Sequence, residues 1–178
     1  QGHQVCSLDM DFLHDGSPKI TKKAIWVKPL ARPSAASPKK DLTCALLKLL
    51  SHPNIASKEW VIRQYDHEVQ GATVLKPLVG ENNDGPSDAC VIKPRFDSFR
   101  GLAVSNGINF KYGDLDPYWM AAGCVDEALR QVVSVGASLK QAAILDNFCW
   151  GNPDKPDRLG ALVRAAFGCY DASKGFGV

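Results

Sequence analysis

The sequence of 178 residues has no long hydrophobic run and no strong excess of either charge. No apolar stretch approaches the ~18 residues that span a bilayer, and the first residues lack the basic and apolar segments of a secretion signal. The 21 Lys and Arg against 19 Asp and Glu leave a net charge of +2, which is too small to indicate a nucleic-acid or anionic-membrane binder. We therefore expect one globular domain with additional segments, and neither a membrane nor a nucleic-acid partner.

Closely spaced cysteines and histidines are also missing. The count of six cysteines suits a disulfide framework, but no C-x-x-C occurs and the nearest two cysteines are 20 residues apart. Dispersed cysteines among Ala, Val and Leu favour small buried side chains in a reducing cytoplasm, which is the localisation we expect. No two histidines have metal-ligand spacing, and no Ser-His-Asp or Cys-His pattern occurs. The sequence predicts no zinc site and no catalytic nucleophile.

The first 53 residues carry few signs of a core. Residues 5–12 alternate and predict a strand that closes a preceding domain. Residues 16–40 hold seven basic residues, four prolines and no acid, which favours a solvated linker over a phosphate-binding segment because Trp26 is the one aromatic residue. Asp41 is the expected N-cap of a short leucine-rich helix that Pro53 ends.

From residue 54 the periodicity predicts helices and strands in an α+β order. We expect a helix over 57–67, strands over 72–76, 88–93 and 101–106, a further strand over 142–145, and a last helix over 155–174 with Gly175 as its stop. The clearest helix has Asp116 as N-cap, Pro117 at its first position and Gly136 at its end. Its expected apolar face is Met120, Cys124, Ala128 and Val132. The order predicts a mixed or antiparallel sheet with helices on one face and the other face free for a partner.

Asp88 is the first candidate for chemistry. It stands at the mouth of a predicted strand, directly after the turn Gly85-Pro86-Ser87. A carboxylate and backbone N–H groups at such a place hold a phosphate and its metal ion in many proteins, whereas the simpler interpretation is an Asx-type turn.

Glu127 is the second candidate. It lies beside Asp126 in the middle of an apolar helix, so one of the two carboxylates must lie nearer the sheet. Such a group holds a metal or nucleotide, or it forms a salt bridge with Arg130 at the surface, and the sequence leaves both open. Gln131, four residues on, shares the face of Glu127.

A third candidate is the segment 145–153, which is rich in acid and amide side chains at the carboxyl end of a predicted strand. Asp146, Asn147 and Asn152 lie there with Trp150. Ligands favour the carboxyl ends of strands in open sheets. A turn in which Trp150 packs on the core explains the same residues equally well.

Four separated blocks resemble the family of phosphoribosylformylglycinamidine synthase large subunits. They are residues 57–70, 85–89, 115–117 and 146–156, and the last contains the unusual loop Asp-Asn-x-x-x-Gly-Asn-Pro. The resemblance covers residues 57–178. It implies an aminoimidazole ribonucleotide synthetase-like fold, in which ATP-binding domains pair their sheets into a shared barrel.

The resemblance also implies an organisation. Residues 1–15 would be the end of a first repeat, residues 16–53 a basic, Pro-rich linker with a short helix, and residues 54–178 a truncated N-terminal α/β domain of the second repeat. The implied enzyme is an ATP-dependent C–N ligase of purine biosynthesis that converts formylglycinamide ribonucleotide to the amidine, with ammonia from a glutaminase subunit or domain. Its catalytic histidine motif belongs to the first repeat, so we expect the isolated chain to be inactive. We also expect a homodimer through the free sheet face, because the first repeat that would cover this face is absent.

By the same resemblance this domain holds an auxiliary site for ATP and magnesium. The implied metal ligands are Asp88 and Glu127. The implied nucleotide- or phosphate-binding residues are Asp88, Asn109, Tyr112, Glu127, Gln131, Asp146, Asn147 and Asn152. Two departures weaken the site, because Gly107 stands where the family commonly has an acid and Gln131 where Asn is frequent. Two functions therefore compete: a nucleotide-binding half of a ligase, and a structural domain that completes the barrel and the assembly interface.

Overall fold

The computed structural model describes residues 2–30, 41–64, 67–68 and 70–178. Its strands form two antiparallel sheets, so the α+β fold class is confirmed. The larger sheet has the order β1-β4-β5, from β1 (Thr73–Leu75), β4 (Cys90–Ile92) and β5 (Leu102–Val104). The helices are α1 (Met10–Asp15), α2 (Thr43–Leu50), α3 (Glu59–Ile62), α4 (Pro117–Ser134) and α5 (Pro156–Phe176), with 3-10 helices η1 (Phe110–Asp114) and η2 (Leu139–Gln141). No helix among these residues is both long and apolar enough to cross a membrane.

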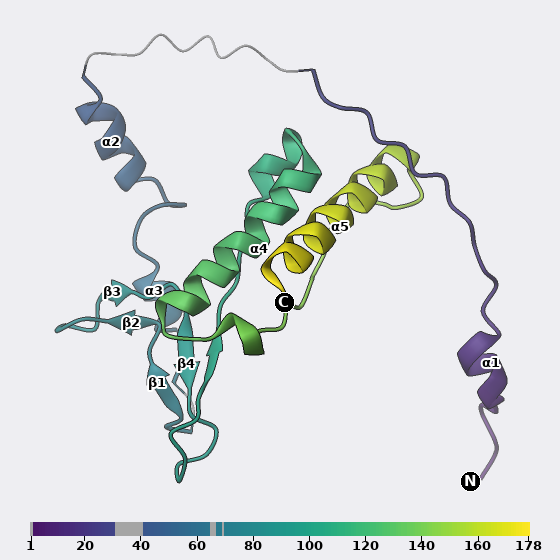
Figure 1. Cartoon of the computed structure of the whole chain (residues 1–178), viewed down its shortest axis with the longest axis horizontal. Coiled ribbons are helices and arrows are strands. Elements are labelled where there is room, and N and C mark those ends of the chain that lie inside the picture. The colour runs from purple at the N-terminus through teal and green to yellow at the C-terminus, as the bar shows by residue number, and fades with distance from the viewer. Residues whose placement is uncertain (1, 31–40, 65–66, 69) are drawn as a thin grey trace.

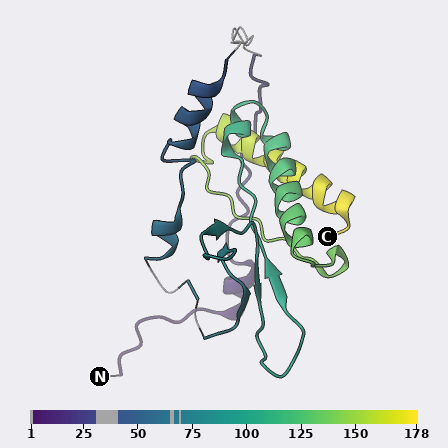
Figure 2. The same cartoon turned by 90° about the vertical axis from the view of Figure 1, so that its left-hand side faces the viewer.

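The three strands of the larger sheet lie where the periodicity predicts them. The register pairs Cys90 with Val104 and Ile92 with Leu102. The small hairpin of β2 (Leu78–Val79) and β3 (Gly85–Pro86) is an addition, at a place where the sequence predicts only a turn. Its loop contains Gly80 and Asn83 at positive φ, the backbone that Gly and Asn adopt most readily. Figures 1 and 2 show α4 and α5 together on one side of the larger sheet.

Helix α4 begins as predicted. The Asp116 side chain accepts a hydrogen bond from the Tyr118 N–H at 3.0 Å, Pro117 occupies the first turn, and Gly136 follows the end at positive φ. The predicted apolar face is wrong by one position, because the buried residues are Pro117, Ala121, Val125 and Leu129. Helix α5 packs on that face, whereas Cys124 and Ala128 face the segment after β5 and stay half-buried.

Helices α4 and α5 form the core. Ala121, Val125 and Leu129 of α4 pack with Ala165 and Cys169 of α5. The two backbones come close at Gly168, where a Cβ would lie 2.2 Å from the carbonyl oxygen of Tyr118. Helix α5 continues past the predicted stop at Gly175 to Phe176, and its C-cap Gly177 has a left-handed φ of 75°. The helix end is therefore two residues later than the pattern indicated.

The segment after α1 is exposed along its described residues except at the half-buried Trp26, as a solvated linker would be, but it also contacts the start of α5. Lys22 pairs with Asp154 at 2.6 Å, and the Ile25 N–H donates to the carbonyl of Pro156 at 2.9 Å. The guanidinium of Arg164 lies 4.0 Å from the centre of the Trp26 ring. Residues 22–26 thus lie across the start of α5. The basic residues Arg32, Lys39 and Lys40 of this stretch lie outside the described residues.

The strand expected over residues 5–12 is also wrong. Residues 10–15 form helix α1, whose N-cap Asp9 accepts a hydrogen bond from the Asp11 N–H at 2.8 Å. A strand needs a neighbour to accept and donate its ladder hydrogen bonds, and Figure 1 shows α1 away from the sheets. Helix α2 is confirmed, but its N-cap is Leu42 and not Asp41, whose carboxylate still accepts from the Thr43 N–H at 2.9 Å. Its leucines stay exposed.

Two further expectations fail in the same way. The segment 142–145 is extended at Ala142 but pairs with no strand in the described part of the chain, and Leu145 is 93% exposed. An apolar run becomes a strand only where a partner strand lies beside it. The helix expected over 57–67 is confirmed only for α3, and Tyr65 and Asp66 lie outside the described residues.

Candidate functional site

Gln131 connects the two segments that the sequence analysis selected. Its amide, oriented with the nitrogen toward two carbonyl oxygens, donates to Asp88 at 2.8 Å and to Asn106 at 2.9 Å. The first carbonyl precedes β4 and the second follows β5, so one half-buried side chain of α4 joins the ends of two neighbouring strands. The site is therefore built where β4 begins and β5 ends.

Glu127 lies one helical turn before Gln131 and faces the same segment. Its Oε2 accepts a hydrogen bond from the Ile108 N–H at 3.0 Å. Asp126 takes the surface role instead, because its carboxylate pairs with Arg130 at 2.7 Å. The structure thus excludes the salt bridge with Arg130 for Glu127, which is the inward, half-buried carboxylate of the pair.

A cleft of about 270 Å³ lies beside this junction. Ser87, Asp88 and Cys90 line it from one strand end, and Ser105 and Asn106 from the other. The Asp88 residue is exposed, so its carboxylate is open to solvent and to a ligand. The Ser87 hydroxyl donates to the Ala89 carbonyl at 2.8 Å, and the Ser105 hydroxyl donates to the Ala128 carbonyl of α4 at 2.7 Å. These two hydroxyls hold the rim of the cleft in place.

Gly107 is the point of closest approach between this segment and α4. A Cβ at position 107 would lie 2.0 Å from the carbonyl oxygen of Cys124. A carboxylate side chain at this position is therefore incompatible with the observed packing. This packing is a physical reason for a glycine at position 107. Asp88 is the acid that lines the cleft, whereas Glu127 bonds the Ile108 N–H of the segment that follows it.

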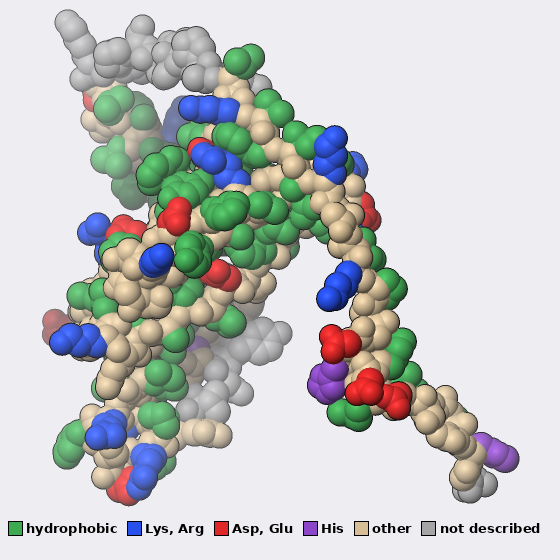
Figure 3. Space-filling view, turned by 45° about the vertical axis from the view of Figure 1, so that its right-hand side comes forward, with side chains coloured by type: hydrophobic (Ala, Val, Ile, Leu, Met, Phe, Trp, Pro, Cys, Tyr) green, Lys and Arg blue, Asp and Glu red, His purple; other side chains and the backbone are tan. Residues whose placement is uncertain are grey.

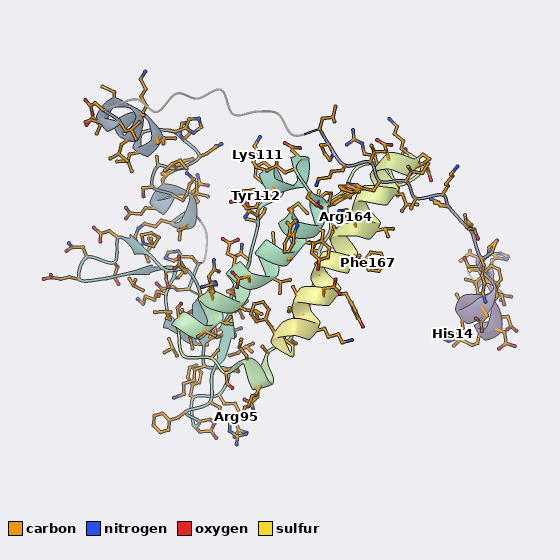
Figure 4. The ribbon with its side chains drawn as sticks, turned by 45° about the horizontal axis from the view of Figure 1, so that its top comes forward. His14, Arg95, Lys111, Tyr112, Arg164 and Phe167 are labelled. Carbon is orange, nitrogen blue, oxygen red and sulfur yellow. The ribbon has the colours of Figure 1, made fainter. Side chains whose placement is uncertain are left out.

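Asn109 and Tyr112 have different surroundings. Asn109 is half-buried, and its backbone lies within hydrogen-bonding distance of the Cys124 thiol, whose pKa is raised chiefly by burial. Tyr112 belongs to η1 and is 51% exposed. Figure 4 places Tyr112 beside Lys111 at the N-terminal end of α4. Asn109 thus contacts Cys124 of α4, the helix that also carries Glu127 and Gln131, whereas Tyr112 points to solvent.

The third group of predicted residues lies elsewhere. Asp146 is next to Cys169 of α5, and burial followed by this carboxylate raises the pKa of the Cys169 thiol to about 11. Asn147 is exposed, and the Asn152 side chain accepts from the Asp154 N–H at 2.9 Å in a turn. The Trp150 indole donates to the Arg158 carbonyl at 3.0 Å. The turn interpretation of this segment thus agrees with the contacts of Trp150 and Asn152.

The donors at the junction are oxygen atoms of carboxylates, hydroxyls and carbonyls. In the described residues no three His, Cys, Asp or Glu side chains come together as a metal site. Mg²⁺ in nucleotide sites is commonly held by one or two carboxylates, with phosphate and water oxygens completing the shell, so this set of oxygen donors fits that ion and not a transition metal. Sequence reasoning missed the carbonyl of Asn106 and the hydroxyl of Ser105, because backbone groups and small polar residues carry no distinctive spacing.

The family of the chain follows from comparison with known proteins. The family model for AIR synthase related protein, N-terminal domain, matches residues 86–178, which include both strand ends, α4 and α5. The chain belongs to this family, and the aminoimidazole ribonucleotide synthetase-like fold inferred from the motifs is confirmed.

Its curated relatives make the resemblance more specific. The phosphoribosylformylglycinamidine synthase subunit PurL of Methanocaldococcus jannaschii is 42% identical over 137 residues, which are 77% of this chain and 17% of that protein. The same subunit of Ignicoccus hospitalis is 39% identical over 171 residues, 92% of this chain and 22% of that protein. That of Anaeromyxobacter dehalogenans is 36% identical over 186 residues, which are 99% of this chain and 23% of that protein. The chain spans about a fifth of the length of these relatives, and the predicted resemblance to the synthase family is confirmed. No solved structure matches the chain.

Proposed function

We propose that the chain functions as part of a phosphoribosylformylglycinamidine synthase. The proposed reaction is the ATP-dependent conversion of formylglycinamide ribonucleotide to its amidine in purine biosynthesis, in the cytoplasm, with ammonia from a glutaminase subunit or domain. The observation that carries this proposal is the similarity to PurL subunits along 77% to 99% of the chain. Residues 54–178 would be the N-terminal domain of the second repeat, residues 16–53 the linker, and residues 1–15 the end of the first repeat.

Within that enzyme we assign this domain a nucleotide- or phosphate-binding role. Asp88 and Glu127 would hold Mg²⁺, which when bound neutralises phosphate charge, and Gln131 and Asn109 would hold the strand ends around the ligand. The support is the junction itself, where the amide of Gln131 bonds the carbonyls of Asp88 and Asn106. Tyr112, Asp146, Asn147 and Asn152 lie away from this cleft, so any contact they make with a ligand would come from outside it.

Titration of the chain with ADP and Mg²⁺ tests this role. We expect saturable, magnesium-dependent heat by calorimetry, with Asp88→Asn and Glu127→Gln each weakening affinity at least tenfold. Asp126→Asn is the matched control, because it removes a neighbouring carboxylate of the same helix that pairs with Arg130 and not with the cleft. Equal affinity in all three variants, or no saturable heat in the unmodified chain, would contradict a nucleotide role.

A structural function is the second candidate, and one feature favours it. Glu127 and Gln131 both bond backbone groups of the segment after β5, which suits a scaffold as well as a ligand site. The domain would then complete a barrel and its assembly interface. A null magnesium titration together with a stable dimer of the chain would support this alternative.

We expect the chain to self-associate as a twofold dimer. Val74, Leu102 and Val104 of the larger sheet are 62%, 53% and 47% exposed, so the strands keep apolar surface in contact with water. A stable contact would bury ~1,200 Å² or more. Sedimentation at micromolar concentration measures this, and Val104→Lys should shift the equilibrium toward monomer. A species that stays monomeric on concentration would refute the dimer.

We also expect no synthase turnover by the chain alone, because the family's catalytic histidine motif is not among its residues. The assay supplies formylglycinamide ribonucleotide, ATP and ammonium chloride and measures ADP release. A full-length PurL preparation under the same conditions is the positive control. Turnover by the chain that rises with its concentration and is absent from a mock purification would refute the expectation.

A further inference from the structure

The loop between β4 and β5, residues 94–101, contains a second cluster of charged and polar side chains, at the other end of β4 from the cleft. Asp88 precedes β4 and this loop follows it, so the two lie at opposite ends of the strand. Figure 4 shows Arg95 at this tip, at the bottom of the view, and Tyr112 well above it. The loop contains Arg95 and Arg100, with Lys93 at its base, against the single acid Asp97.

A surface hollow of about 510 Å³ lies within this loop, and Arg95, Asp97, Ser98 and Arg100 line it. This volume is in the range of small-molecule sites, although the hollow is open to solvent, so a ligand would bind weakly. Figure 3 shows basic and hydrophobic side chains, with one acidic group among them, at the lower left tip of the molecule. Phe99 is fully exposed, and the Lys93 ammonium lies 5.2 Å from the centre of its ring.

The arginines have donors to spare. Arg95 donates to the two oxygens of Asp97 at 3.1 and 2.7 Å, which uses only two of its five N–H groups and fixes the plane of the guanidinium. Arg100 has no carboxylate partner among the residues that the structure describes. The Ser98 hydroxyl accepts from the Arg100 N–H at 3.1 Å, so its own proton is available to a ligand oxygen.

We propose that residues 94–101 bind a small phosphate-bearing molecule through Arg95, Ser98 and Arg100. Guanidinium groups match phosphate oxygens in pairs, and two arginines with a hydroxyl supply the donors that such a group accepts. The hollow holds one carboxylate against two guanidinium groups, so it attracts an anion and not a metal ion. This site is additional to the proposed function, because it shares no residue with the Asp88 cleft.

The test is a titration of the full, ¹⁵N-labelled chain with inorganic pyrophosphate at constant ionic strength. We expect saturable shifts of the amides of residues 94–101, with a dissociation constant on the order of millimolar. Arg95→Gln and Arg100→Gln should each weaken binding about fivefold or more, and Asp97→Asn should strengthen it. Arg130→Gln is the control, since it removes an equally exposed arginine from α4 and should change nothing.

Several outcomes would overturn the proposal. These are shifts that never saturate, shifts centred on Asp88 and Asn106 instead, or unchanged affinity in both arginine variants. Because the amide shifts are read at residues 94–101, a negative result in this titration does not bear on the Asp88 site. A negative result in the titration with ADP and Mg²⁺ at the Asp88 site likewise does not bear on residues 94–101. A parallel titration with ADP identifies the source of the phosphate. If ADP binds more tightly than pyrophosphate and Phe99→Ala removes the difference, the ligand is a nucleotide. Equal affinity for ADP and pyrophosphate supports a site for phosphate alone.

Discussion

Replacing Gly168 by alanine is expected to lower the free energy of unfolding by about 1–3 kcal/mol, the usual cost of overpacking a core. Helix propensity alone predicts the opposite, because alanine is favoured over glycine in a helix by about 1 kcal/mol. The contact reverses the sign: the new Cβ would lie 2.2 Å from the carbonyl oxygen of Tyr118, so α4 and α5 would have to separate around Ala165 and Cys169. Urea unfolding followed by circular dichroism measures the change.

Gly123 supplies the matched control, since it lies inside α4 and a Cβ added there would meet no atom within 4 Å. Gly123→Ala should therefore stabilise the chain by up to about 1 kcal/mol. Opposite signs for the two substitutions would establish the close crossing of α4 and α5. Stabilisation by both would mean that the helices are farther apart at Gly168.

Replacing Asp116 by asparagine is expected to cost about 1.5–3 kcal/mol at neutral pH, the value of a hydrogen bond to a charged group. Arg164 donates to both oxygens of Asp116 at 2.6 Å and lies over the Trp26 ring. This residue of α5 therefore contacts both the start of α4 and the segment of residues 22–26. Asparagine preserves the N-cap, which isolates the contribution of the charge. Asp116→Ala removes both and should cost more.

The same pair makes stability depend on pH. The hydrogen bonds from Arg164 hold the pKa of the Asp116 carboxyl below its ordinary value, against the opposing effect of burial. The unfolded chain takes up this proton near pH ~3.9, so the stabilisation is present above that pH and is lost as the pH falls through the lower pKa of the folded state. Asp116→Asn should abolish this part of the acid dependence.

Asp126→Asn is the control for both effects, because Asp126 forms an exposed pair with Arg130 on the same helix. Exposed pairs of this kind change stability little. Equal losses for Asp116→Asn and Asp126→Asn would contradict a special role of the Arg164 pair. A double-mutant cycle with Arg164→Met measures the coupling directly.

The elements that sequence reasoning predicted well are those with several local signals. Helix α4 has a capping Asp116, a proline in its first turn and a terminal glycine, and each acts within a few residues of chain. The expected strands over 5–12 and 142–145 had only an apolar pattern. Whether such a pattern becomes a strand depends on a partner strand that no local signal reveals.

The candidate site was predictable to the same degree. Glu127 and Gln131 are four residues apart, so helical spacing alone put them on one face, and the structure confirms that both contact the segment after β5. Spacing did not separate Asp126 from Glu127. Asp146 was selected because it follows a predicted strand, and in the structure its neighbour is Cys169.

Composition, helix caps, strand periodicity and four motif blocks were thus enough to determine the α+β class, the main helices and the family, because each depends on short stretches of chain. The packing of α5 on Ala121 and Val125, the approach of α4 to Gly107 and Gly168, and the contact of Trp26 with Arg164 were decided only in three dimensions. Each of these joins segments far apart in sequence. Their geometry depends on how whole helices and strands fill space together, which residue order does not specify locally.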